Sequence, residues 1–163
     1  MKASKFSLYL SFLVIFCAMS CKEEGEKAVQ AAPISFQKEG DLIIYKAKTD
    51  SIIASFEIEI ADNDYETETG LMYRKAMKSN RGMLFIFPNS AMHSFYMKNT
   101  AISLDILFID EHMQIASLQE NAKPYNESSL SSKVPVKYVL ELNAGLSEKL
   151  NLKVKDSISF TKL

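Results

Sequence analysis

Residues that commonly carry out catalysis are scarce in this chain of 163 residues, which has two cysteines, two histidines, five glycines and no tryptophan. It contains neither Gly-x-Ser-x-Gly nor His-Glu-x-x-His, so a serine hydrolase of the nucleophile-elbow type and a zinc peptidase of that class are both excluded. A phosphate-binding glycine loop is absent as well. Because the familiar zinc sites need several cysteine or histidine ligands, we expect no metal site and no cofactor.

An excess of basic charge is also lacking, since the formal net charge is −1 at pH 7. No basic stripe with interleaved aromatic residues occurs, so nucleic acid is not expected as a partner. The chain has a single long apolar run, from Phe6 to Met19, and that run is too short for a permanent membrane span.

The start of the chain has the pattern of an export signal. Lys2 and Lys5 precede the apolar run, which ends in Ala18-Met19-Ser20 directly before Cys21. A charged start, a short apolar stretch and small residues before a cysteine are typical of a bacterial lipoprotein signal. We therefore predict a signal peptide over 1–20 and lipidation of Cys21. An ordinary signal peptide cleaved nearby, or a short signal anchor, is the alternative.

Residues 21–34 are predicted to form a flexible tether, because they are rich in charged and small residues and show no apolar periodicity. Lys-Glu-Glu after Cys21 also resembles a surface-export signal of some Gram-negative lipoproteins, although any soluble linker can carry such charges. The expected location is the bacterial cell envelope, with a lipid anchor at Cys21 in the outer membrane, on its periplasmic face or at the cell surface.

The remaining residues, 35–163, are enough for one domain. Apolar and polar residues alternate along 51–60, which indicates a strand with one buried and one mostly solvated face. The other expected strands are 42–48, 83–87, 93–98, 104–110, 113–118, 136–142 and 157–161. Short helices are expected at 65–77, with an interruption near Gly70, and at 144–150, and a long loop at 121–134. This pattern predicts a mainly β fold with one or two short helices, as a single compact β-sandwich or barrel-like domain.

Polar residues stand between two of the most apolar stretches of the chain, around Lys98 and Asp105. Asp105 and Glu141 both lie within apolar runs, so each carboxylate needs a cation or backbone donors if it is buried. Arg74 and Lys98 are the cations expected to face them, in a cleft walled by Met83, Phe95 and Tyr96. The candidate ligand-binding residues are Arg74, Tyr96, Lys98, Asn99, Thr100, Asp105 and Glu141.

Four blocks of sequence resemble the domain of unknown function 192 (DUF192) family. They are Gly-Leu-Met-Tyr-Arg (70–74), Gly-Met-Leu-Phe-Ile-Phe (82–87), Phe-Tyr-Met-Lys-Asn-Thr-Ala-Ile-Ser-Leu-Asp (95–105) and Val-Leu-Glu-Leu-Asn-Ala-Gly (139–145). Two positions depart from the family pattern: Tyr96 stands where tryptophan is usual, and Lys153-Val154-Lys155-Asp156 replaces a Pro-Gly-Asp turn. The resemblance implies a compact, mainly β domain that is often exported, and it implies no catalytic residues.

Three functions fit these residues, beside a purely structural network that pins a loop to a strand. The first is a binding module for a small polar ligand, such as a carbohydrate, or for an envelope component. The second is a carbohydrate-active hydrolase that uses Asp105 and Glu141 as paired carboxylates. The third is an envelope assembly factor with 121–134 as its contact surface. The sequence favours a binding module over an enzyme, and it favours a partly buried, hydrogen-bonded imidazole for His93 over a catalytic base.

Overall fold

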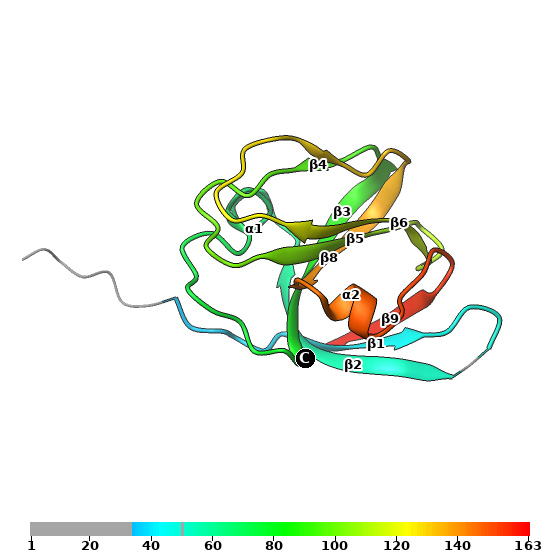
Figure 1. Cartoon of the computed structure of the whole chain (residues 1–163). Coiled ribbons are helices and arrows are strands. Elements are labelled where there is room, and N and C mark those ends of the chain that lie inside the picture. The colour runs from blue at the N-terminus through cyan, green and yellow to red at the C-terminus, as the bar shows by residue number, and fades with distance from the viewer. Residues whose placement is uncertain (1–33, 50) are drawn as a thin grey trace, which may run out of the picture. The chain divides into compact units, whose positions relative to one another are not determined.

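The computed structural model describes residues 34–49 and 51–163, which form one compact unit (Figure 1). The predicted signal peptide, Cys21 and nearly all of the predicted tether lie outside the described residues. In the described part of the chain, no helix has both the length and the apolar character needed to cross a membrane.

The described residues form nine strands and two short helices. In chain order these are β1 (Gly40–Tyr45), β2 (Ile52–Ala61), α1 (Asp64–Thr69), β3 (Arg81–Ala91), β4 (Ser94–Phe95), β5 (Leu104–Ile109), β6 (Ile115–Ala122), β7 (Leu130–Ser131), β8 (Val136–Asn143), α2 (Leu146–Lys149) and β9 (Ser157–Lys162). The prediction of a mainly β domain with two short helices is confirmed.

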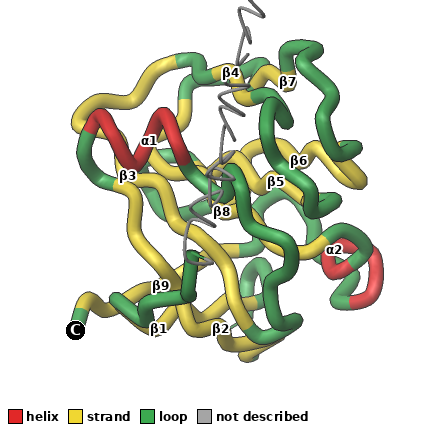
Figure 2. Tube along the Cα trace, turned by 90° about the vertical axis from the view of Figure 1, so that its left-hand side faces the viewer, coloured by secondary structure: helices red, strands yellow, loops and turns green. Residues whose placement is uncertain are grey.

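Seven of the strands form one mixed sheet in the order β6-β5-β8-β3-β2-β1-β9, while β4 and β7 pair separately (Figures 1 and 2). Only β2 and β3 are parallel among the neighbours of the large sheet. The edge strands approach each other at one end, where Ile115 N–H donates to Asp156 O (2.8 Å) and Ile158 N–H donates to Met113 O (2.8 Å). This contact is a single isolated bridge, so the sheet is curled but is not a closed barrel.

The central strands are buried on both faces, because the sheet has a hydrophobic cluster on each side. Along β3, Leu84 belongs to one cluster and Phe85 to the other; along β5, Leu107 and Phe108 divide in the same way. Strands β1, β2 and β9 pack on the first cluster, while β4, β7 and the residues around α1 cover the second. Continuous apolar runs such as 83–87 are therefore explained by burial on two sides.

Helix α1 is shorter than the predicted helix 65–77. Asn63 caps its start by accepting a hydrogen bond from Glu66 N–H (3.0 Å). Gly70 ends it with a left-handed φ of 46°, and a Cβ at that position would lie 3.0 Å from Phe85 Cζ. Glycine fits here because it tolerates this φ and leaves room for the aromatic ring.

The expected long loop 121–134 is partly regular and is tied to the rest of the domain. Strand β6 extends to Ala122, and β7 pairs with β4. Main-chain bonds join Met97 N–H to Asn126 O (2.8 Å) and Ser132 N–H to His93 O (2.9 Å). The segment therefore packs on the domain instead of forming a free loop.

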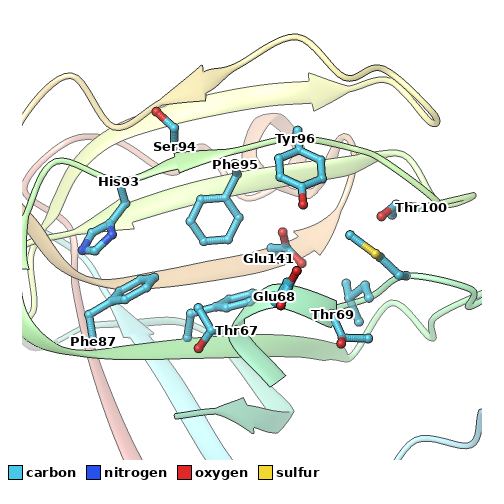
Figure 3. Close-up of a pocket in the computed structure, with 14 residues that line it drawn as sticks. Thr67, Glu68, Thr69, Phe87, His93, Ser94, Phe95, Tyr96, Thr100 and Glu141 are labelled. Carbon is cyan, nitrogen blue, oxygen red and sulfur yellow. The ribbon is translucent and has the colours of Figure 1, made fainter. Parts of the chain in front are cut away.

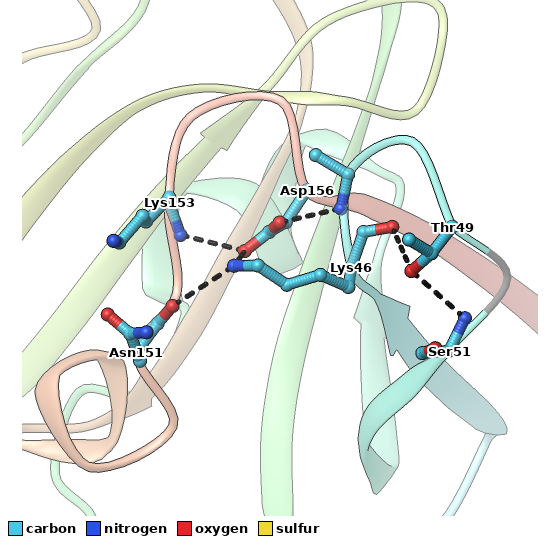
Figure 4. Close-up of polar contacts among 7 residues, drawn as sticks. Lys46, Thr49, Ser51, Asn151, Lys153 and Asp156 are labelled. Atoms are coloured by element: carbon cyan, nitrogen blue, oxygen red, sulfur yellow. Dashed lines mark hydrogen bonds and ion pairs between the residues drawn. The ribbon is translucent and has the colours of Figure 1, made fainter.

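Asp156 fixes the turn before β9, at the place where the sequence departs from the family pattern. Its carboxylate accepts hydrogen bonds from Ala47 N–H (2.8 Å), Lys153 N–H (2.9 Å) and Lys46 Nζ (3.0 Å) (Figure 4). Burial by itself would raise the pKa of Asp156, but these donors outweigh it and lower the pKa. Lys155 takes the left-handed conformation with φ 80°, so a turn forms here without glycine.

Candidate functional site

A pocket of about 250 Å³ opens between α1, β3, β4 and β8, on the side of the sheet that carries the second hydrophobic cluster (Figure 3). Three phenylalanines form much of its wall, and they fix one another by edge-on packing: Phe95 lies 5.0 Å from Phe85 and 6.4 Å from Phe87 between ring centroids. The lining residues are Thr67, Glu68, Thr69, Gly70, Leu71, Met72, Phe85, Phe87, His93, Ser94, Phe95, Tyr96, Thr100 and Glu141.

Glu141 supplies a buried carboxyl group to this pocket. It lies on β8 opposite Met83 of β3 and Ile106 of β5, and it is 6% exposed. Burial raises its pKa from 4.5 to about 8, and no hydrogen bond or cation from another described residue opposes that shift. The group is therefore mostly a neutral carboxylic acid at pH 7, which can both donate and accept a hydrogen bond.

His93 lies at another part of the same pocket, stacked on Phe87 with 3.6 Å between ring centroids and 17° between ring planes. Burial lowers its pKa, so the imidazole is neutral at pH 7. Its Nε2 is buried without a hydrogen-bond partner among the described residues. The expected partial burial is confirmed, but the ring is held by stacking where a side-chain hydrogen bond was expected.

Of the seven candidate ligand-binding residues, Tyr96, Thr100 and Glu141 line the pocket, whereas Arg74, Lys98, Asn99 and Asp105 do not. The expected pairing of Arg74 with Asp105 or Glu141 is wrong. Arg74 instead forms a two-point contact with Glu59 of β2, with Nη1 2.7 Å from Oε2 and Nη2 2.9 Å from Oε1. Glu59 is only 5% exposed, although alternation assigned it to a mostly solvated face.

Asp105 is held by backbone donors on the other side of the sheet. Its carboxylate accepts hydrogen bonds from Asn121 N–H (2.9 Å) and from Ser147 N–H of α2 (2.8 Å), and it is 1% exposed. It pairs with Leu142 in the register of β5 and β8, one position from Glu141, so the two carboxyl groups point to opposite faces. They cannot act together on one glycosidic bond.

Lys98, Asn99 and Thr100 form a turn beside the pocket. Asn99 adopts a left-handed φ of 55°, and its Nδ2 donates to Tyr73 Oη (2.9 Å) while Tyr73 N–H donates to Asn99 O (2.8 Å). Thr100 Oγ1 donates to Lys98 O (3.2 Å). The turn therefore holds the 71–74 segment in place and positions Thr100 in the pocket wall, which makes Asn99 a structural residue.

Sequence reasoning missed the contribution of α1 to the pocket. Thr67, Glu68 and Thr69 all line it, as does Phe87 of β3. The sequence predicted a helix beginning near residue 65, but nothing local to the sequence indicates that its C-terminal end lies beside Phe85. The position of Gly70 was the available signal, because a glycine at a helix end also permits close packing of another element.

Most of the folded part of the chain matches a known family. The model of the family described as DUF192, uncharacterized ACR, matches residues 45–160. The chain belongs to the DUF192 family. Two curated relatives are UPF0127 proteins. The one from Pyrococcus furiosus is 26% identical over 112 residues (66% of this chain, 89% of the relative), and the one from Thermococcus sibiricus is 27% identical over 118 residues (69% and 71%).

Two solved structures are similar to this chain in fold. One, from Sinorhizobium meliloti 1021, is described as a candidate transcription regulator; it is 33% identical, with a TM-score of 0.72 over 79% of this chain and 98% of that chain. The other, from Novosphingobium aromaticivorans, is of unknown function and is 30% identical, with a TM-score of 0.71 over 80% and 94%. The family has no established activity to transfer to the pocket around Glu141.

Proposed function

We propose that this DUF192 protein is a lipid-anchored binding protein of the bacterial cell envelope, whose folded domain holds a small polar ligand in the pocket at Glu141. The observation that supports ligand binding is a carboxyl group, 94% removed from solvent, that faces an aromatic pocket without a partner among the described residues. The Glu141 oxygens are open to the pocket, so a ligand there can form hydrogen bonds that no described residue supplies. Strongly shifted carboxyls in pockets are typical of functional sites.

A binding role is better supported than hydrolysis, because a paired-carboxylate mechanism needs both groups at one bond and the partner proposed for Glu141 lies across the sheet. Glu68 is the other carboxyl at the pocket, and it is exposed on α1. The envelope assembly role of 121–134 is a weaker proposal, since main-chain hydrogen bonds tie that segment to the domain.

The pocket can be tested with the protein purified from cells that express the full chain. We would screen a panel of monosaccharides, small alcohols and small amines by saturation-transfer NMR. At least one compound should bind, and Thr69→Tyr, which places a ring at the pocket, should abolish the signal. Thr49→Tyr, in the turn between β1 and β2, is the matched control. Binding that survives unchanged in Thr69→Tyr, or a panel with no binder, would contradict the proposal.

The anchor is tested separately at the two cysteines. Cys21→Ser should prevent incorporation of labelled fatty acid and release the protein from the membrane fraction, because it removes the only thiol left after cleavage at the predicted site. Cys17→Ser, inside the apolar run, should leave both properties unchanged. Equal labelling of the two variants would show that the chain is not a lipoprotein anchored at Cys21.

A further inference from the structure

The charged groups that line the pocket indicate which class of ligand it can bind. Two carboxyl groups, from Glu68 and Glu141, line it together with the rings of Phe85, Phe87, Phe95 and Tyr96. No lysine or arginine of the described chain is among the lining residues. The remaining basic group, His93, is held neutral because burial lowers its pKa. The pocket therefore has no positive charge with which to bind an anion.

The cations that the sequence placed near this site are engaged or located elsewhere. Arg74 is paired with Glu59 at 2.7 Å, and Lys98 is exposed and does not line the pocket. A phosphate or carboxylate ligand would consequently face Glu68, the neutral Glu141 acid and the negative faces of aromatic rings, with no cation to pair with. The aromatic faces disfavour an anion and attract a cation, and a cation can also pair with Glu141 once that group is ionised.

Aromatic faces with a nearby carboxylate are the usual surroundings of an organic ammonium group in proteins, where each cation–π contact contributes about 0.5–2 kcal/mol. Figure 3 shows Glu141 among the lining side chains, with Phe95 and Tyr96 on one side of it and Glu68 on another. A volume of about 250 Å³ suits a small molecule. We propose that the ligand of this pocket is a small organic cation, whose ammonium group pairs with the Glu141 carboxylate between the aromatic walls.

This inference rests on the proposed function and adds to it that Glu141 loses its proton when the ligand binds. The titratable groups that face the pocket beside Glu141 are Glu68 of α1, His93 before β4 and Tyr96 after it, and none carries a positive charge at pH 7. An ammonium that enters favours the ionised form of Glu141, so the carboxyl O–H gives its proton to the solvent. A neutral sugar would pair with the protonated acid and release none.

The test uses three probes of equal length and different charge: n-butylammonium, 1-butanol and butyrate. In the purified full-length protein, labelled with ¹³C at glutamate carboxyl carbons, each probe is titrated at pH 7 by NMR. We expect n-butylammonium to bind at least tenfold more tightly than 1-butanol and to move the Glu141 carboxyl chemical shift to the value of the ionised group. Butyrate should not bind. Glu141→Gln should weaken the binding of n-butylammonium at least tenfold and change the affinity for 1-butanol by no more than twofold.

Glu68→Gln, at an exposed position of α1, should weaken the binding of n-butylammonium only two- to threefold. This variant provides a second test of the pocket if Glu141→Gln does not fold. The inference is overturned if 1-butanol binds as tightly as n-butylammonium, if Glu141 stays protonated at saturation, or if n-butylammonium does not bind. A monosaccharide that binds in the Thr69-sensitive pocket while n-butylammonium does not would overturn the cation class and leave the proposed binding function intact.

Discussion

Asp105 and Glu141 lie on neighbouring strands and project from opposite faces of the same sheet. In the register of β5 and β8, Asp105 pairs with Leu142, whereas Glu141 pairs with Ile106. One carboxylate is satisfied by two backbone donors at the start of α2 and the end of β6, and the other has no partner among the described residues. Two acidic residues of similar burial therefore have separate roles, one in stability and one in the pocket.

Asp105→Asn should lower the stability of the protein without weakening the binding of ligands in the Glu141 pocket. An amide presents one acceptor oxygen where the carboxylate presents two, so Asn121 N–H or Ser147 N–H loses its bond, at a cost of about 1–3 kcal/mol in the free energy of unfolding. Urea denaturation measures this cost. Glu148→Gln, an exposed change in α2, is the control and should stay within about 0.5 kcal/mol of wild type. A fully stable Asp105→Asn protein would show that these hydrogen bonds contribute little.

The pH dependence of stability should report on Glu141. Because its pKa is about 8 when folded and about 4.5 when exposed, the folded state binds more protons than the unfolded state between these values. The free energy of unfolding therefore falls as pH rises from about 4.5 to about 8, by up to about 5 kcal/mol, and levels off above that range.

Glu141→Gln removes this titration, so the difference in stability between wild type and variant isolates it. Chemical denaturation at pH 5, 7 and 9 should show that the free energy of unfolding of the variant increases relative to that of wild type as pH rises. Parallel profiles of the two proteins would mean that the pKa of Glu141 is close to its ordinary value.

Glu59 and Arg74 should be strongly coupled. Both are nearly buried, with 7% and 11% of their side chains exposed, so removing one partner leaves an uncompensated charge at a cost of about 3–5 kcal/mol. We expect Arg74→Met and Glu59→Gln to be severely destabilised individually, and the double variant to lose much less than their sum. The exposed Lys38–Asp41 pair, at 2.7 Å, is the matched control and should couple by less than about 1 kcal/mol. Additive effects at Glu59 and Arg74 would contradict this view of the pair.

Lys155→Gly should stabilise the protein. Lys155 adopts φ 80°, a conformation that costs an L-residue roughly 1 kcal/mol and glycine almost nothing. A rise of a few degrees in the thermal midpoint is therefore expected, although the added freedom of the unfolded chain offsets part of it. Lys153→Gly, two residues earlier and not among the left-handed residues, should lower the midpoint instead. Equal effects at both positions would argue against strain at Lys155.

The strands were predictable because alternation and apolar runs are local properties of the sequence. Residues 51–60 and 136–142 correspond closely to β2 and β8. The expected strands 104–110 and 113–118 are joined by a turn that contains no glycine. Asp110 Oδ1 accepts from His112 N–H and Gln114 N–H, both at 2.9 Å, while Met113 takes a left-handed φ of 61°.

The arrangement of the site was only partly predictable, because it depends on which strands become neighbours. The sequence identified Glu141 and Asp105 as carboxylates that need compensation, but which face each occupies follows from the register of β5 on β8. The partner of Arg74 was missed because the alternation in 51–60 assigns Glu59 to solvent, and only the path of the chain after Gly70 brings the guanidinium over it. Long-range pairing of this kind leaves no local signal.

The position of β8 in the sheet has a consequence for biosynthesis. This strand, which is late in the chain, hydrogen-bonds to both β3 and β5 and is the link between the β1–β3 group and the β5–β6 hairpin. Until residues 136–143 have been made, a nascent chain holds two β fragments with no shared strand, each with an open edge. The sheet can be joined only after β8 has been made, so Glu141 and the pocket that it lines are assembled after the strands on either side.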